Sequence, residues 1–117
     1  MRPRVFFIER PRPNISMSKA LDFGDTVIVF DTNDRRCSIF DAKGFGHALI
    51  ERLEKAQFAP AQDHVCIAGS MVTVAVGIAA IVAKYSRVSL LLYNANQDEY
   101  VPRFVGKGVW KNEVSEM

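Results

Sequence analysis

The alternation of apolar runs and polar breaks along this chain predicts a small α/β domain. In the central part of the chain, the pattern predicts a strand at residues 64–68, a turn at Gly69 and Ser70, a helix at 71–85 and a strand at 88–93. An apolar run that ends at a glycine and leads through a helix to another apolar run is typical of a right-handed crossover between parallel strands. We therefore expect a parallel pair within the sheet.

The flanking segments predict further strands. A short apolar run at residues 5–8 is followed by a loop containing Pro and Ser at 11–18, which no regular element would tolerate. Apolar runs at 26–31 and 37–41 are separated by five polar or charged residues, a pattern typical of a β-hairpin. A second hairpin is expected where the apolar runs at 88–93 and 100–105 flank a polar stretch.

Between these strands, Asp41 can cap an amphipathic helix. Its expected core positions are Phe45, Leu49, Leu53 and Ala56. The whole order is then β-ββ-α-β-α-ββ, that is, a small Rossmann-like α/β domain with a mixed sheet of five or six strands and two main helices. We expect this single domain to span residues 1–105, followed by a polar C-terminal tail at 106–117.

The helix at 71–85 is apolar around almost its whole circumference, so it needs cover on more than the side that faces the sheet. Small and polar residues form a single stripe along it by helical spacing: Ser70, Thr73, Gly77, Ala80 and Lys84. A second subunit could provide the cover, which makes Thr73, Gly77, Ala80 and Lys84 candidates for a homo-oligomer interface. The alternative is cover by the N-terminal segment and the tail.

Composition adds few constraints. The chain has 117 residues, 49% of them hydrophobic, and a net charge of +2, which by itself implies no acidic partner. Cys37 and Cys66 lie in apolar runs without metal or redox spacing, so buried free thiols are expected, with a bridge between them as the alternative. The apolar stretch at 65–83 is interrupted at Gly69, and we see no signal peptide, so we expect a cytoplasmic protein without a membrane segment.

The junction at Gly69, Ser70 and Met71 is the strongest candidate for a ligand site. Free N–H groups at the start of a helix attract anions, and open α/β sheets bind ligands at the carboxyl ends of parallel strands. A single glycine is weaker evidence than a phosphate-binding fingerprint, and Gly69 as a simple turn residue is the alternative.

Asp31 ends an apolar run. The sequence VIVFDTN at residues 27–33 resembles the opening strand of PIN-type nucleases, and this resemblance implies Asp31 as a metal ligand. Those domains continue with a helix, whereas a second strand is expected here. From the residues alone, Asp31 can equally form an Asx turn beside a hairpin. His47 and His64 have no metal-ligand spacing, so we predict no metal site and no cofactor.

The first twelve residues contain four arginines: Arg2, Arg4, Arg10 and Arg12. Arginines mixed with aromatic residues and Pro are found in proteins that bind single-stranded nucleic acid, but charges and Pro also protect ordinary edge strands. The leading hypothesis is therefore a non-catalytic binding or assembly module that forms a homo-oligomer. The alternatives are a metal-dependent phosphodiester enzyme that uses Asp31, and nucleic-acid binding through the Arg-rich arm.

Overall fold

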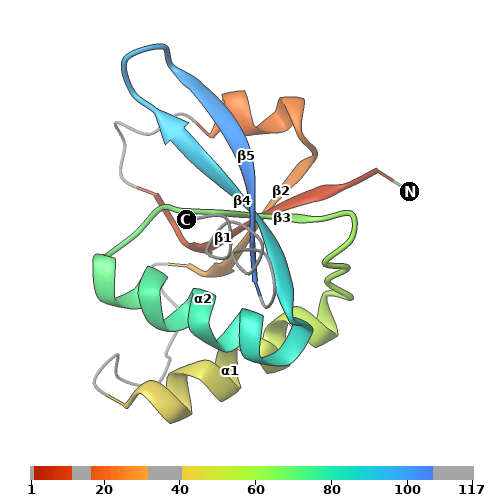
Figure 1. The fold of residues 1–117 in the computed structure, drawn as a ribbon, viewed down its shortest axis with the longest axis vertical. Coiled ribbons are helices and arrows are strands. Elements are labelled where there is room, and N and C mark those ends of the chain that lie inside the picture. The colour runs from red at the N-terminus through yellow and green to blue at the C-terminus, as the bar shows by residue number, and fades with distance from the viewer. Residues whose placement is uncertain (1, 12–16, 32–40, 107–117) are drawn as a thin grey trace, which may run out of the picture.

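A computed structural model describes residues 2–11, 17–31 and 41–106 of the chain. Its elements, in chain order, are β1 (Arg4–Glu9), the 3-10 helix η1 (Ser18–Asp22), β2 (Asp25–Phe30), α1 (Ala42–Lys55), β3 (His64–Cys66), α2 (Met71–Tyr85), β4 (Arg87–Asn94) and β5 (Glu99–Gly106) (Figure 1). No helix in the described part is long and apolar enough to cross a membrane. The expected tail lies, after Gly106, outside the described residues.

The strands form one mixed sheet in the order β2-β1-β3-β4-β5. The first four strands are parallel to their neighbours, and β5 returns antiparallel to β4. This arrangement confirms the predicted α/β class with a mixed sheet and two main helices. The strand predicted at 37–41 falls, except for its last residue, outside the described residues, so the first hairpin stays a prediction.

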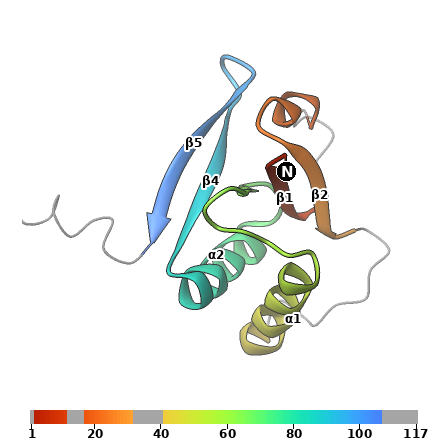
Figure 2. The same cartoon turned by 90° about the vertical axis from the view of Figure 1, so that its right-hand side faces the viewer.

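The two main helices cover one face of the sheet, and η1 lies on the other (Figure 2). The direction of the connections explains this division. The step from β1 to β2 moves along the sheet one way, whereas the steps from β2 to β3 and from β3 to β4 move the other way. Right-handed crossovers that run in opposite directions lie on opposite faces. The sequence pattern did not predict η1, because this helix is only one to two turns long.

Strand β1 is buried on both faces, as expected for a central parallel strand. Phe6 and Ile8 face α1 and α2, while Val5 and Phe7 face η1. The predicted core of α1 is confirmed, since Phe45, Leu49 and Leu53 are buried against the first face and Ala56 packs at its margin. Both main helices begin at a capping side chain: Asp41 accepts a hydrogen bond from the Gly44 N–H, and Ser70 accepts one from the Thr73 N–H.

The outer strands, β2 and β5, contact or carry arginine side chains, and β5 also contains a proline. On β2, the Nη1 of Arg52 donates a 2.8 Å hydrogen bond to the carbonyl oxygen of Val29. The same guanidinium lies 4.5 Å from the centre of the Phe30 ring. On β5, Pro102 provides no N–H group, and Arg103 follows it. The missing N–H group of Pro102 removes a donor that a further strand could otherwise use at the β5 edge.

Candidate functional site

The carboxyl ends of β1, β2 and β3 meet at one end of the sheet, where open α/β sheets commonly bind ligands. The strand order reverses between β1 and β3, and such a reversal is the usual position of a site. The structure places Glu9 and Arg10 at the end of β1, Asp31 after β2, and Ser70 at the junction of β3 and α2. The anion site predicted at residues 69–71 lies here.

The anionic group at this junction belongs to the chain itself. Glu9 accepts a 2.5 Å hydrogen bond on Oε1 from the backbone N–H of Ser70. Gly69 has a φ of 122°, and a Cβ there would collide with the Glu9 side chain, so the glycine leaves the space that Glu9 fills. A ligand anion would have to displace this carboxylate. Anion binding at residues 69–71 therefore stays a prediction, and it now includes an internal competitor.

Asp31 forms a two-pronged ion pair with Arg10. The Nε–Oδ1 and Nη2–Oδ2 distances are 2.8 and 2.9 Å, and the hydrogen bond and charge of Asp31 raise the pKa of Arg10. Two other acids are engaged elsewhere, with Asp41 capping α1 and Asp98 accepting a hydrogen bond from the Tyr93 hydroxyl. Within the described ranges, no group of three or more Asp, Glu, His or Cys side chains could hold a metal ion. The described acids do not assemble the site that the phosphodiester hypothesis requires.

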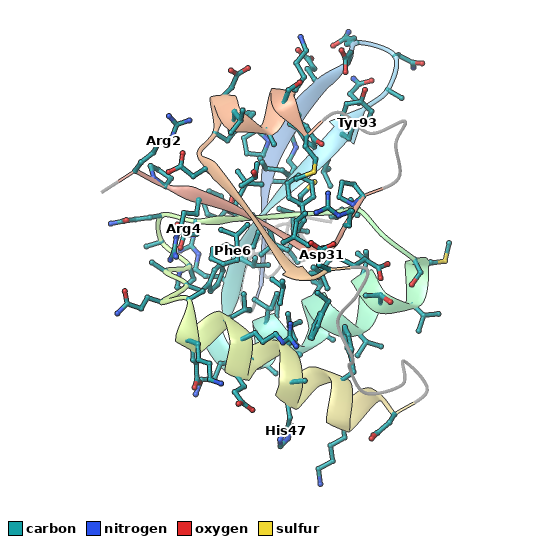
Figure 3. The ribbon with its side chains drawn as sticks, turned by 180° about the vertical axis from the view of Figure 1, so that it is seen from behind. Arg2, Arg4, Phe6, Asp31, His47 and Tyr93 are labelled. Carbon is teal, nitrogen blue, oxygen red and sulfur yellow. The ribbon has the colours of Figure 1, made fainter. Side chains whose placement is uncertain are left out.

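The described arginines of the N-terminal arm bind acidic and carbonyl groups of the chain itself (Figure 3). Arg2 pairs with Asp25 at 3.2 Å. Arg4 pairs with the buried Asp63 at 3.3 Å and donates to backbone carbonyls at the end of α1. Arg12 lies outside the described residues. These contacts satisfy the guanidinium groups that a nucleic acid would otherwise bind.

Arg87 and Arg103, on the outer hairpin of β4 and β5, do not extend these residues into a basic face. The guanidinium of Arg87 lies 4.8 Å from the centre of the Phe104 ring. Strand alternation places Arg87 on the η1 face with Leu91, whereas Arg103 is opposite Leu90 and shares the helix-covered face. The described arginines are thus divided between the two faces, and nucleic-acid binding stays a prediction without a shared basic surface.

The small residues of α2 face partly inward. Thr73 and Gly77 are buried, and a Cβ added to Gly77 would lie 2.7 Å from Cδ1 of Ile8. The absent side chain lets α2 approach β1 and α1 closely. Of the four residues proposed for an oligomer interface, Thr73 and Gly77 are therefore already covered within the chain, whereas the half-buried Ala80 and the exposed Lys84 reach the outer surface.

A groove of about 860 Å³ lies between α1 and α2. It is on the side of the helices away from the sheet, since the sheet-facing positions of α1 are the buried core residues. The helices come close at its centre, where a Cβ on Gly46 would lie 3.4 Å from the Cβ of Ala80. Ile50 is half-buried, while Ala79 and Ala83 are exposed. The floor of the groove is therefore apolar and built mostly from small residues.

Charged and polar side chains stand around this floor. Lys84 pairs with Glu54 at 3.2 Å near the ends of both helices, and Glu51 pairs with Lys55 at 3.3 Å along α1. His47 projects outward from α1 (Figure 3). Lys43 lies near the start of the same helix, and no ion pair of its amino group is found in the described part of the chain. The groove thus has an apolar floor and a charged rim.

Polar groups inside the sheet are paired with one another. His64 Nδ1 lies 2.7 Å from Ser89 Oγ, and desolvation lowers the pKa of His64. Cys66 is a buried free thiol, as predicted, beside the Tyr100 hydroxyl, and burial raises its pKa to about 12. Cys37 lies outside the described residues. A nucleophilic cysteine needs a lowered pKa, so the environment of Cys66 is that of a structural thiol.

Two parts of this site were not foreseen. The first is Glu9, whose only sequence signal is a charged residue at the end of an apolar strand. The second is the groove, because the polar side of an amphipathic helix is ordinarily expected to face water. A usable signal was Gly46, since glycine inside a helix costs about 1 kcal/mol and is usually kept for close packing.

Comparison with known proteins places most of the chain in one family. A family described as Phage Pam3 gp32-like protein matches residues 3–106, which include every strand and helix of the structure. No curated protein and no solved structure matches the chain.

Proposed function

We propose that this chain, which belongs to the phage Pam3 gp32-like family, is a non-catalytic binding or assembly module that works through the outer face of α1 and α2. The observation that carries the proposal is the groove between the two helices. Its apolar floor is open to solvent and its charged residues stand on the rim, which is the usual anatomy of a protein-binding surface.

Further apolar side chains are exposed at the start of α2. Met71 is 87% exposed and Val72 is 47% exposed. Methionine is flexible and adapts to different partners, so it is common on binding surfaces. A shallow groove between helices also fits the side chains of another helix better than it fits a small enclosed ligand. These features support a polypeptide as the partner.

The first prediction tests this face by substituting Ala79 with Arg. Ala79 is exposed and lines the groove, so the substitution adds bulk and charge to the binding surface without entering the core of the monomer. We expect the wild-type chain to self-associate at high micromolar concentration and Ala79→Arg to sediment as a monomer. Sedimentation velocity over a concentration series measures both.

The matched control is Ala61→Arg, which makes the same chemical change in the exposed loop between α1 and β3, outside the groove. It should associate like wild type. Thermal unfolding of both variants at low concentration checks that the monomer is intact. Wild-type protein that remains monomeric at high micromolar concentration would contradict self-association through this face.

A further inference from the structure

The charges on the α1 side of the groove follow a directional pattern. Lys43 lies near the amino end of the helix, and Glu51 and Glu54 lie toward its carboxyl end. Lys43 and Glu51 are roughly two helical turns apart, about 12 Å. A stripe that is positive at one end and negative at the other matches an identical stripe placed in the reverse direction. The surface is therefore complementary in charge to a copy of itself.

We propose that the occupant of the groove is a second copy of this chain, packed so that the α1 helices of the two copies lie against each other in antiparallel directions. This inference rests on the proposed function and adds its partner and geometry. An interface between identical surfaces has a two-fold axis, and here the axis passes close to His47. It brings Lys43 of each copy opposite Glu51 of the other.

The shape of the groove supports the same arrangement. Ile50 is the largest aliphatic side chain that α1 contributes to the groove, and Gly46, one turn away, has no side chain to project from the floor. An antiparallel pairing centred near His47 places Ile50 of each copy over the glycine-containing turn of the other. Side chains that fill hollows of the facing helix are the general basis of helix packing.

A second two-fold arrangement is geometrically possible, with the axis along the helices and α1 of each copy over α2 of the other. It brings Glu54 opposite Lys84. Glu54 and Glu51 both already pair within one chain, with Lys84 at 3.2 Å and with Lys55 at 3.3 Å, so these pairs do not separate the two arrangements. In the second arrangement, however, Lys43 would gain no carboxylate, and the helices would run parallel, which aligns their dipoles unfavourably. The antiparallel arrangement gives Lys43 a partner and opposes the dipoles, so the charges favour it.

Charge reversal tests the arrangement. Lys43→Glu and Glu51→Lys should each weaken self-association roughly tenfold, because each replaces two attractive contacts per dimer by repulsive ones. The double variant Lys43→Glu/Glu51→Lys should restore the dissociation constant to within about threefold of wild type, since the pairs are re-formed with the signs exchanged. Sedimentation velocity at low ionic strength measures all four proteins, because these rim charges are screened by salt.

Cross-linking gives a readout that does not depend on charge. In a Cys37→Ser background, His47→Cys places one thiol from each copy near the two-fold axis, where mild oxidation should form a disulfide dimer. Ala61→Cys, outside the groove, should not cross-link at the same concentration. The native Cys66 does not interfere, because it is buried and its pKa is raised to about 12.

The outcomes separate this inference from the proposed function. A monomeric wild type would overturn both. If the wild type associates and Ala79→Arg blocks association, yet the double variant is no better than the single ones and His47→Cys stays unlinked, only the antiparallel arrangement is overturned. The charges of Glu54 and Lys84 can be reversed singly and together in the same way. If each single reversal weakens self-association and the double reversal restores it, the antiparallel arrangement is overturned in favour of the parallel one.

Discussion

Gly69 lies beside a polar contact between two segments that are far apart in the chain. Its φ of 122° lies in a region that residues with a side chain rarely adopt, and the space beside it holds the Glu9 carboxylate. That carboxylate binds the Ser70 N–H, next to the start of α2. One glycine therefore decides both the direction in which the chain leaves β3 and which group occupies the junction.

The Gly69→Ala variant should lower the free energy of unfolding by about 1–3 kcal/mol, because it combines backbone strain with a collision against Glu9. Chemical denaturation measures this loss. The Glu9→Ala substitution removes the collision but not the strain, so Gly69→Ala should cost less when made in the Glu9→Ala background. An equal cost in both backgrounds would show that strain alone is responsible.

At the level of elements, one polar pair joins β3 and β4 beneath the 3-10 helix. His64 opens β3, its ring is 2.7 Å from the Ser89 hydroxyl on β4, and its edge meets the Phe23 ring beside η1. Desolvation lowers the pKa of His64, and the charge of Asp63 only partly opposes that effect. Protonation of the ring is therefore disfavoured in the folded chain relative to the unfolded one.

This difference predicts a loss of stability in weak acid. The unfolded chain binds the proton at the ordinary pKa of histidine, about 6.5, whereas the folded chain binds it only at lower pH. The contribution of His64 should be fully present above pH 6.5 and fall as pH decreases through the window between the two values. Denaturation at several pH values should show a weaker acid dependence for His64→Gln than for the control His47→Gln, which is on the exposed face of α1. Identical pH profiles would rule out this role of His64.

At the scale of the whole molecule, the pattern of apolar runs was sufficient for the architecture. The range of α2 was predicted at 71–85, as observed, because Ser70 provides a cap and the apolar run is uninterrupted. The start of α1 followed in the same way from Asp41. The 3-10 helix was not predictable, since Ala20 is its single buried residue and short helices carry no periodic signal.

The candidate site was less accessible to sequence reasoning. The junction at residues 69–71 could be identified, but its occupation by Glu9 depends on a contact between residues far apart in the chain. The small stripe of α2 was predicted to form an oligomer interface, yet which neighbour each of its residues packs against depends on the position of α1. Gly77 shows this, because the space that a side chain would need there is filled by Ile8 and Leu49 of the same chain.

The central position of Cys66 allows a test of cooperative folding. The thiol is buried in the sheet, and its pKa of about 12 keeps it protonated near neutral pH. In a Cys37→Ser background, a thiol reagent at pH 8 should label Cys66 roughly a hundredfold or more slowly than the unfolded chain. Labelling should accelerate with denaturant along the global unfolding curve. Rapid labelling of the native protein would mean that the sheet opens locally at β3.

The two edges of the sheet have a consequence for growth of an assembly. Self-association brings the sheet edges of different copies close together. An open edge can then pair with a strand of another copy, so that one sheet extends into the next without limit. On β5, Pro102 interrupts the open edge, because it provides no N–H group. The contacts proposed between the α1 helices would close after two copies, whereas open edges lead to filaments. Replacing Pro102 with a residue that has an N–H group would therefore expose the chain to fibre formation before it changed the fold.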